Sequence, residues 1–325
     1  MANDDRELSR RQFLGRCIKT SALAGVALAA GAYFRNRHVV PATTSTARVR
    51  PFGVPGTEGI FAAVKGRNPH AIARQAVETA GGMSRFVSRG DKVLIKVNCA
   101  FARPAWVGAT TSPEVTSEIV AMCYEAGAAQ VRVTDNPISD PESCFARSGL
   151  NDAVEKAGGQ ILLPRPADFR SVRVSRGVIG TWDVFCQPLR WCDKLIGIPT
   201  VKTHNLCGAS LGMKNWYGFF GGSRSRFHQQ IQAVIVELAQ FITPTLVVLD
   251  GTRLLMRNGP TGGSAADVTP GDTVAVSTDQ VALDAFGAKL LSLAPSDLKF
   301  IGLAERAGLG TSNYAALPHY QEVSM

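Results

Sequence analysis

The stretch that decides the fold is residues 93–136, which begins with the apolar run VLIKV (93–97) and closes with VRVT (131–134) followed by Asp135-Asn136. Between the two runs, Ser112-Pro113-Glu114 predicts a helix start, because a Ser side chain accepts hydrogen bonds from free amides and Pro fits the first turn. The helix is expected to end near Gly127. A strand, a helix and a second strand in this order are typical of an α/β fold with parallel strands.

The same alternation continues to the end of the chain. We expect further strands at 195–198, 246–249 and 273–277, and helices at 227–241 and 281–293, where apolar residues recur at helical spacing. The chain has 325 residues, 45% of them hydrophobic, which is enough for a large core. We therefore predict an α/β protein with a largely parallel sheet flanked by helices, a single large domain that could divide into two α/β lobes.

The domain boundaries follow from composition. The α/β domain is expected over residues 61–312, behind a Pro-, Thr- and Gly-rich linker at 41–60 and before a C-terminal tail at 313–325. Residues 1–40 form a separate signal or anchor segment, in which the motif SRRQFL (9–14) precedes an uncharged, Ala-rich run at 20–34. This pattern predicts a twin-arginine export signal, and hence the twin-arginine translocase as a partner and a periplasmic or otherwise exported location.

The export signal has two further implications. Ala30-Gly31-Ala32 is a candidate cleavage site, and an uncleaved leader would leave a membrane anchor, although its uncharged run is shorter than the about 20 residues that span a bilayer comfortably. Proteins exported by this route are already folded and often carry a cofactor, so we expect a metal or an organic cofactor, and a redox or membrane partner.

Composition narrows the class of ligand. The formal net charge is +9, but residues 1–40 hold seven basic and three acidic groups, so +4 of this excess belongs to the leader. The remainder shows no basic stripe interleaved with aromatic residues, which argues against nucleic acid. Six cysteines follow the leader and none forms a C-x-x-C pair, so an iron–sulfur cluster has no support. Disulfides and buried free thiols both remain open.

Polar residues follow several of the expected strands. Asn98, Asp135, Asp250 and Asp279 each come directly or almost directly after one. Ligands of open α/β sheets bind beyond the carboxyl ends of the strands, so we expect Asn98, Asp135 and Asp250 to line one rim. Asp135 and Asp250 are candidate metal ligands, and Asp279 and Asp284 are second-rank ones. The alternative for each is an ordinary turn, cap or helix-dipole role.

The segment PTVKTHNLCGASLGMKNWYG (199–218) is the densest in functional groups, and its glycines predict a loop rather than a helix. Lys202, His204 and Lys214 are the candidate catalytic residues: the lysines would neutralise an anionic substrate and His204 would transfer a proton. Lys96, Asn98 and Asn215 are candidate substrate-binding residues. A solvated surface for the lysines and a structural role for His204 are the alternatives.

A second candidate anion site follows. The segment GGSRSR (221–226) leads directly into the helix expected from Phe227, so backbone amides, the positive helix end, Arg224 and Arg226 could bind phosphate or carboxylate. A flexible basic loop is the alternative. Neither a Walker sequence nor a dinucleotide fingerprint occurs, so a nucleotide has no direct support.

These residues resemble the domain-of-unknown-function family 362 over about residues 93–310. The resemblance rests on the order and spacing of seven blocks, namely IKVN (95–98), TTSPE (110–114), VTD (133–135), PTVKTH (199–204), KNWYG (214–218), NGP (258–260) and DQVALDA (279–285). It implies an α/β domain whose reaction is not established. The cysteine clusters of the ferredoxin-fused members are missing, so an iron–sulfur role does not carry over.

Two minor alternatives concern residues 204–214. His204, the Gly208–Gly212 turn and Lys214 are spaced similarly to the residues that hold the cofactor in nickel-pincer lactate racemases, although further histidine ligands have no evident counterpart. The same turn satisfies G-x-S-x-G with Ser210 at its centre, which is typical of serine hydrolases. Asp250 or Asp279 with His319 would complete that triad in the expected order.

Two classes of function therefore stay open. The first is an exported enzyme, cofactor- or metal-assisted, that acts on a small anionic substrate at the rim of the sheet. The second is a cofactor-binding or electron-transfer accessory protein without turnover. Loss of turnover with retained cofactor in His204→Ala and Lys214→Ala variants would favour the enzyme.

Overall fold

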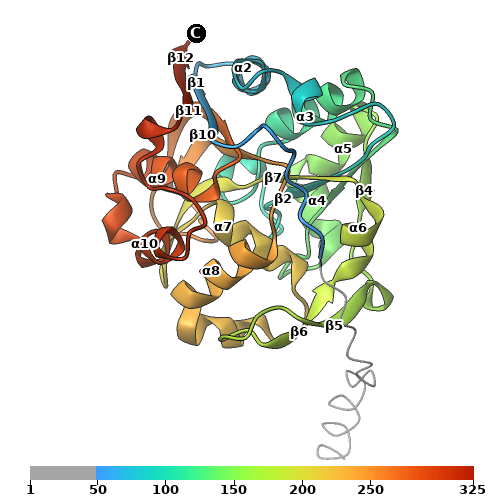
Figure 1. The fold of residues 1–325 in the computed structure, drawn as a ribbon, viewed down its shortest axis with the longest axis vertical. Coiled ribbons are helices and arrows are strands. Elements are labelled where there is room, and N and C mark those ends of the chain that lie inside the picture. Colours follow the sequence, from blue (N-terminus) through green and yellow to red (C-terminus); the bar gives the residue numbers. More distant parts are fainter. Residues whose placement is uncertain (1–48) are drawn as a thin grey trace, which may run out of the picture. The chain divides into compact units, whose positions relative to one another are not determined.

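The computed structural model describes residues 49–325. The expected export signal and residues 41–48 of the expected linker lie outside the described residues. The described residues belong to one compact unit. They fold around one mixed sheet with helices on both faces rather than as two lobes, which confirms the predicted α/β class (Figure 1).

The strands of the main sheet lie in the order β12-β1-β11-β10-β7-β2-β3-β4, in which β12 is His319–Ser324. From β10 (Leu246–Leu255) through β7 (Lys194–Ile198), β2 (Lys92–Val97), β3 (Gln130–Thr134) and β4 (Gln160–Leu162), all pairs are parallel. The strand β11 (Val268–Ser277) runs antiparallel to β10 and to β1 (Ile60–Lys65). The carboxyl ends of the parallel strands therefore meet at one edge, whereas β11 ends at the opposite edge.

Alternation along the strands explains why the sheet is covered on both faces. In β2, Val93, Ile95 and Val97 belong to one core cluster and Leu94 to the other, as expected when successive side chains point to opposite faces. Figure 1 shows α2, α3 and α5 on one side of the strands and α7, α8, α9 and α10 on the other. The first layer comprises α2 (Pro69–Thr79), α3 (Pro113–Glu125), α4 (Pro141–Ser148) and α5 (Leu150–Lys156). The second comprises α6 (Cys186–Trp191), α7 (Gly212–Asn215), α8 (Ile231–Phe241), α9 (Gln280–Leu290) and α10 (Lys299–Arg306).

Helix starts follow the sequence closely. Ser112 caps α3 by accepting a hydrogen bond from the Val115 amide at 3.3 Å, and Pro113 occupies the first turn, as predicted. The expected helix at 281–293 is α9, which begins one residue earlier and ends at Leu290. The expected helix at 227–241 is a 3-10 helix over Arg224–Gln230 that continues as α8.

Residues 199–218 differ from the predicted loop. Thr200–His204 forms β8, which pairs with β10 and with β9 (Gly208–Ser210), and the short helix α7 follows directly. The glycines permit this path: Gly208 has φ of 84°, which favours glycine at the end of the hairpin turn. The segment is therefore a hairpin and a helical turn, and the expectation of a loop was wrong.

Both ends of the predicted domain also differ from expectation. Phe52, in the expected linker, is buried, and its amide donates to the Thr243 carbonyl at 2.9 Å. Residues 313–325 are not a free tail, because His319–Ser324 forms β12 and pairs in parallel with β1. The hairpin of β5 (Phe169–Arg173) and β6 (Thr181–Phe185) forms a separate two-stranded sheet.

Two further features concern the cysteines and the helices of residues 49–325. The cysteines of the described region are all free and buried, namely Cys99, Cys123, Cys144, Cys186, Cys192 and Cys207. Among residues 49–325, no helix combines the length and apolar character that a membrane crossing requires.

Candidate functional site

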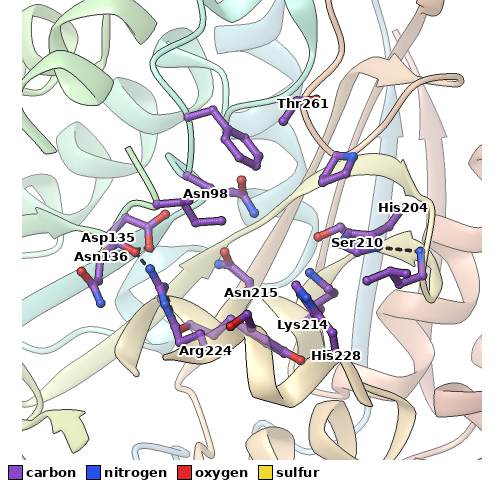
Figure 2. A pocket seen from close by; sticks show the side chains of 18 of the residues that line it. Asn98, Asp135, Asn136, His204, Ser210, Lys214, Asn215, Arg224, His228 and Thr261 are labelled. Atoms are coloured by element: carbon purple, nitrogen blue, oxygen red, sulfur yellow. Dashed lines mark hydrogen bonds between the residues drawn. The ribbon is translucent and has the colours of Figure 1, made fainter. Parts of the chain in front are cut away.

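A cavity of about 720 Å³ lies at the carboxyl edge of the parallel strands. Residues that follow β2 and β3 line it together with residues of the β8–β9 hairpin, α7 and the 3-10 helix (Figure 2). The predicted residues that line it are Lys96, Asn98, Asp135, Lys202, His204, Ser210, Lys214, Asn215 and Arg224. Four basic side chains thus face the cavity with one carboxylate, which makes it strongly cationic.

Lys96 and Asp135 form a buried ion pair beneath this cavity, with Nζ 2.8 Å from the Asp135 carboxylate. The Cys99 amide donates to the other carboxylate oxygen at 2.6 Å, and Lys96 Nζ also donates to Asn215 Oδ1 at 3.2 Å. Gly218 makes this packing possible, because a Cβ at this position would collide with both Asp135 and Lys96. The single carboxylate of the cavity is therefore already neutralised by Lys96.

Lys202 is buried on β8, and its amine donates to Asn98 Oδ1 at 2.9 Å and to the Ala109 carbonyl at 2.5 Å. Both contacts are to neutral oxygens. Burial, together with the nearby Lys214 cation, lowers the pKa of Lys202 to about 7. This lysine can therefore gain or lose a proton near neutral pH, which is the property expected of a general acid or base.

Lys214 extends from α7 with its amine 4.8 Å from the centre of the Tyr217 ring. Across the described residues, neither Lys214 nor Lys202 forms an ion pair with a carboxylate. Burial lowers the pKa of Lys214 as well. The Tyr217 hydroxyl is buried and finds no hydrogen-bond partner within residues 49–325. The cavity thus offers unmatched positive charge and an unmatched hydroxyl to a ligand.

His204 is neutral in this setting. Burial and the cations of Lys214 and Lys202 lower its pKa to about 3. Its Nδ1 accepts the Leu206 amide at 3.2 Å, which places the imidazole proton on Nε2. His204 is therefore suited to donate a hydrogen bond through Nε2 rather than to carry a proton between states, which differs from the role predicted for it.

Arg224 fixes the wall formed by the residues after β3. Its guanidinium donates to the Asn136 carbonyl at 2.9 Å and to the Pro137 carbonyl at 3.0 Å. Arg226, two residues on, does not line the cavity and instead lies over the Trp182 ring, 5.5 Å from its centre. Of the two arginines predicted to bind the anion, the structure places one at the cavity.

The other predicted carboxylates serve the scaffold. Asp250 accepts hydrogen bonds from the Ser112 amide at the start of α3, at 2.6 Å, and from Thr252. Asp284 accepts from the Gly212 and Met213 amides at 2.6 and 3.1 Å, which holds the start of α7. Neither lines the cavity.

Asp279 lies at the opposite edge of the sheet, because β11 is antiparallel to β10. It caps α9 by accepting hydrogen bonds from the amides of Val281 and Ala282, which is the cap role given above as the alternative for this residue. Asp135, Asp250, Asp279 and Asp284 do not come together, and in the part of the chain that the structure describes no three His, Cys, Asp or Glu side chains are grouped to hold a metal ion.

Ser210 ends β9 immediately before α7, so its local setting is a strand, a turn and a short helix. The Gly212 and Met213 amides that follow it are occupied by Asp284. His319 lies exposed in the edge strand β12 and does not line the cavity. The triad suggested by G-x-S-x-G is therefore not assembled.

Several residues of the cavity were not among the predicted site residues, including Phe101, Ile138, Leu206, Tyr217 and His228. The His228 ring centre lies 6.3 Å from that of His204. A usable signal was present for Tyr217, which follows Lys214 by three residues, a spacing that puts two side chains on one face of a helical turn. Phe101 and His228 come from a loop and a 3-10 helix, whose side-chain directions no periodicity reveals.

Fold and site together define an α/β protein with a cationic cavity at the carboxyl edge of its parallel strands. The chain belongs to the family described as Domain of unknown function (DUF362), whose model matches residues 93–289.

Two individual proteins are similar to this chain. The "Thylakoid-associated protein sll1697" of Synechocystis sp. is 28% identical over 253 residues, which cover 74% of this chain and 75% of that protein. The structure of the lactate racemase apoprotein from Thermoanaerobacterium thermosaccharolyticum matches with a TM-score of 0.40 and 13% identity, over 74% of this chain. The match spans 60% of that racemase chain.

Proposed function

We propose that the cavity binds a small organic anion and that the protein is an enzyme acting on it. One observation carries this proposal: the Lys202 and Lys214 amines face a cavity of about 720 Å³ without a carboxylate partner among the described residues. A buried, unmatched cation is costly, and an anionic ligand supplies the missing charge. The one carboxylate nearby, Asp135, is held by Lys96.

The side chains divide the chemistry between them. Lys202, with its pKa near 7, moves a proton to or from the bound molecule. Lys214 and the Nε2 hydrogen of His204 stabilise negative charge that develops on the substrate. Asn98 orients the Lys202 amine through its side-chain oxygen. The reaction class supported by this set is proton transfer next to a carboxylate or a phosphate.

Binding of acetate and of inorganic phosphate to the full chain, measured by calorimetry, tests the proposal. We expect Lys202→Met and Lys214→Met each to weaken binding by about 10- to 100-fold, because each removes a charge-assisted hydrogen bond. Lys299→Met is the matched control, since Lys299 is exposed at the start of α10. Equal affinities in all four proteins would contradict an anion site at this cavity.

A second candidate is a cofactor-binding protein, favoured by the nitrogen atoms of His204, His228 and Lys214 around one cavity. Nitrogen ligands suit nickel, copper and zinc. Two imidazoles do not complete a coordination sphere, so an organic cofactor would have to supply further ligands. Metal analysis and an absorption spectrum test this candidate. Loss of a chromophore in His228→Ala, with no turnover found in the unmutated protein, would favour it over the enzyme.

We also propose export of the folded protein by the twin-arginine route. The SRRQFL motif at residues 9–14 supports it, and the cysteines of residues 49–325, all free and buried, fit a chain that folds in a reducing compartment. Arg10→Lys with Arg11→Lys is expected to keep the protein in the cytoplasm, as followed by cell fractionation. Unchanged export of this variant would contradict the proposal.

A further inference from the structure

Few large apolar side chains of the described region are exposed. They are Trp106, Ile138, Val178, Leu206 and Met325. Two of the five, Ile138 at 70% and Leu206 at 50% exposure, line the cationic cavity. A side chain that lines a cavity and is at least half exposed lies where the cavity opens. The mouth of the cavity therefore carries the apolar side chains of Ile138 and Leu206 beside exposed polar residues, namely Asn205, Ser223, Ser225 and His228, whereas its interior is cationic.

The two side chains are held in place by separate segments. Ile138 follows β3, and its amide donates to the Ala100 carbonyl at 2.9 Å, which ties this segment to the one after β2. Leu206 lies in the turn between β8 and β9, and its amide donates to His204 Nδ1 at 3.2 Å. Both side chains therefore belong to positioned backbone segments that border the same cavity, where a bound ligand can cover them.

Apolar surface also reaches inward. Phe101 lines the same cavity, and Lys202 Nζ lies 5.7 Å from the centre of its ring. A ligand whose anionic group contacts Lys202 therefore meets an aromatic ring beside that group and aliphatic side chains at the mouth. A small, fully polar anion such as phosphate would leave Phe101, Ile138 and Leu206 unused.

We propose that the ligand is an amphipathic anion, with its carboxylate or phosphate at Lys202 and Lys214 and an apolar tail against Phe101, Ile138 and Leu206. This inference rests on the proposed anion site and names the substrate class for it. The arrangement resembles other ligand pockets in which a few polar groups fix one end of the molecule and apolar side chains cover the remainder.

The test uses the full chain and two series of probes, the straight-chain carboxylates from acetate to octanoate and the corresponding alkyl phosphates, with octanol as a neutral probe. In the unmutated protein we expect affinity to rise about fourfold for each methylene that contacts Ile138 or Leu206. Octanol is expected to bind at least tenfold more weakly than octanoate, because it lacks the charge. Comparison of the two series identifies the preferred anionic group.

The double variant Ile138→Ser/Leu206→Ser is expected to lose most of the dependence of affinity on chain length between acetate and octanoate. Both positions are exposed, so folding should be unaffected. Val178→Ser is the matched control, since Val178 is 40% exposed and lies outside the cavity. This control should keep the full dependence on chain length.

The outcomes separate the inference from the proposed function. If acetate and phosphate bind through Lys202 but affinity is independent of chain length, the amphipathic ligand is refuted and the anion site stands. If no short anion binds and Lys202→Met changes nothing, the proposed function fails as well. A third outcome is that affinity does not depend on chain length, that the unmutated protein binds anionic lipid vesicles and that the Ile138→Ser/Leu206→Ser variant does not. This outcome would assign Ile138 and Leu206 to a membrane-binding surface and refute the inference.

Discussion

Two sets of buried ionisable side chains, Asp250 with Asp284 and Lys202 with Lys214, differ in the partners that the fold gives them. Asp250 and Asp284 are surrounded by donors, chiefly the backbone amides that begin α3 and α7. Lys202 and Lys214 border a cavity, and their amines meet neutral oxygens or an aromatic ring. Burial of an ionisable side chain is common to both sets. The difference is that the lysines keep binding capacity that the fold does not use, and this is what marks a site.

The largest expected effect is the loss of stability when a buried carboxylate that accepts hydrogen bonds from backbone amides is removed. Asp284→Ala leaves the buried amides of Gly212 and Met213 without an acceptor, so we expect a loss of about 3 kcal/mol in the free energy of unfolding. Denaturant titration measures this loss. Asp284→Asn keeps one acceptor oxygen and should lose about half as much. A loss below about 0.5 kcal/mol in Asp284→Ala would show that this carboxylate does not hold α7.

Burial raises the pKa of Asp284 to about 7, which adds a pH dependence. The folded protein then binds a proton at Asp284 more tightly than the unfolded chain does. The stabilisation of the folded protein that comes from this proton is fully present below the ordinary pKa of an Asp and is lost as pH rises through about 7. The advantage of the unmutated protein over Asp284→Asn should therefore shrink between pH 5 and pH 8, whereas a constant difference would contradict the raised pKa.

The next effect concerns the matched pair at the cavity floor. A methyl group at Gly218 would collide with Asp135 and Lys96, so Gly218→Ala is expected to cost about 2 kcal/mol of stability. Gly263→Ala is the control, because a Cβ there meets open space. Equal denaturation midpoints for the two variants would mean that the close approach at Gly218 is not required by the pair.

The lysines without a carboxylate partner predict that the affinity for acetate depends on pH. The pKa of Lys202 is lowered to about 7, so the amine loses its proton as pH rises through this value. Acetate stays ionised from pH 6 to pH 8, and we expect its affinity to fall about tenfold over this range. Lys202→Met should abolish the dependence. A profile that is flat in the unmutated protein would place the lysine outside the binding step.

The smallest expected effect is a difference in anion affinity between variants of two neighbouring arginines. Arg226→Ala is expected to change anion affinity by less than about twofold, since an exposed charge away from the cavity is screened by solvent. Arg224→Ala removes a cation that lines the cavity and releases the Asn136 and Pro137 carbonyls, so a loss of about fivefold or more is expected. Equal losses in the two variants would indicate a diffuse electrostatic effect rather than a local one.

The fold was accessible from sequence wherever periodicity and capping agreed. The strand at 93–97, the cap at Ser112 and the strand at 131–134 were predicted within one residue, because apolar alternation and capping chemistry act locally. The structure of residues 199–218 was not predicted, because the hairpin there depends on pairing between β8 and the distant β10. Local propensity carries no information about such a partner.

The same limit applies to the candidate site, where local sequence signals placed some residues correctly and others incorrectly. Asn98 and Asp135 were placed correctly at one edge because parallel strands end together. Asp250 was expected at the same rim but does not line the cavity, because β10 continues past it to Leu255 and its carboxylate accepts the Ser112 amide. Arg224 and Arg226 could not be separated by sequence, since which of them faces the cavity is set by the turns of a 3-10 helix.

The strand β12 has a consequence for handling the protein. It covers the outer side of β1, a strand in which five of six residues are buried. Removal of residues 319–324 would leave β1 with a row of unpaired amides and carbonyls beside an apolar surface, which is a template for association between molecules. A shortened chain should therefore aggregate even with an intact cavity, and an affinity tag is better joined beyond Met325 through a flexible spacer than substituted for the final strand.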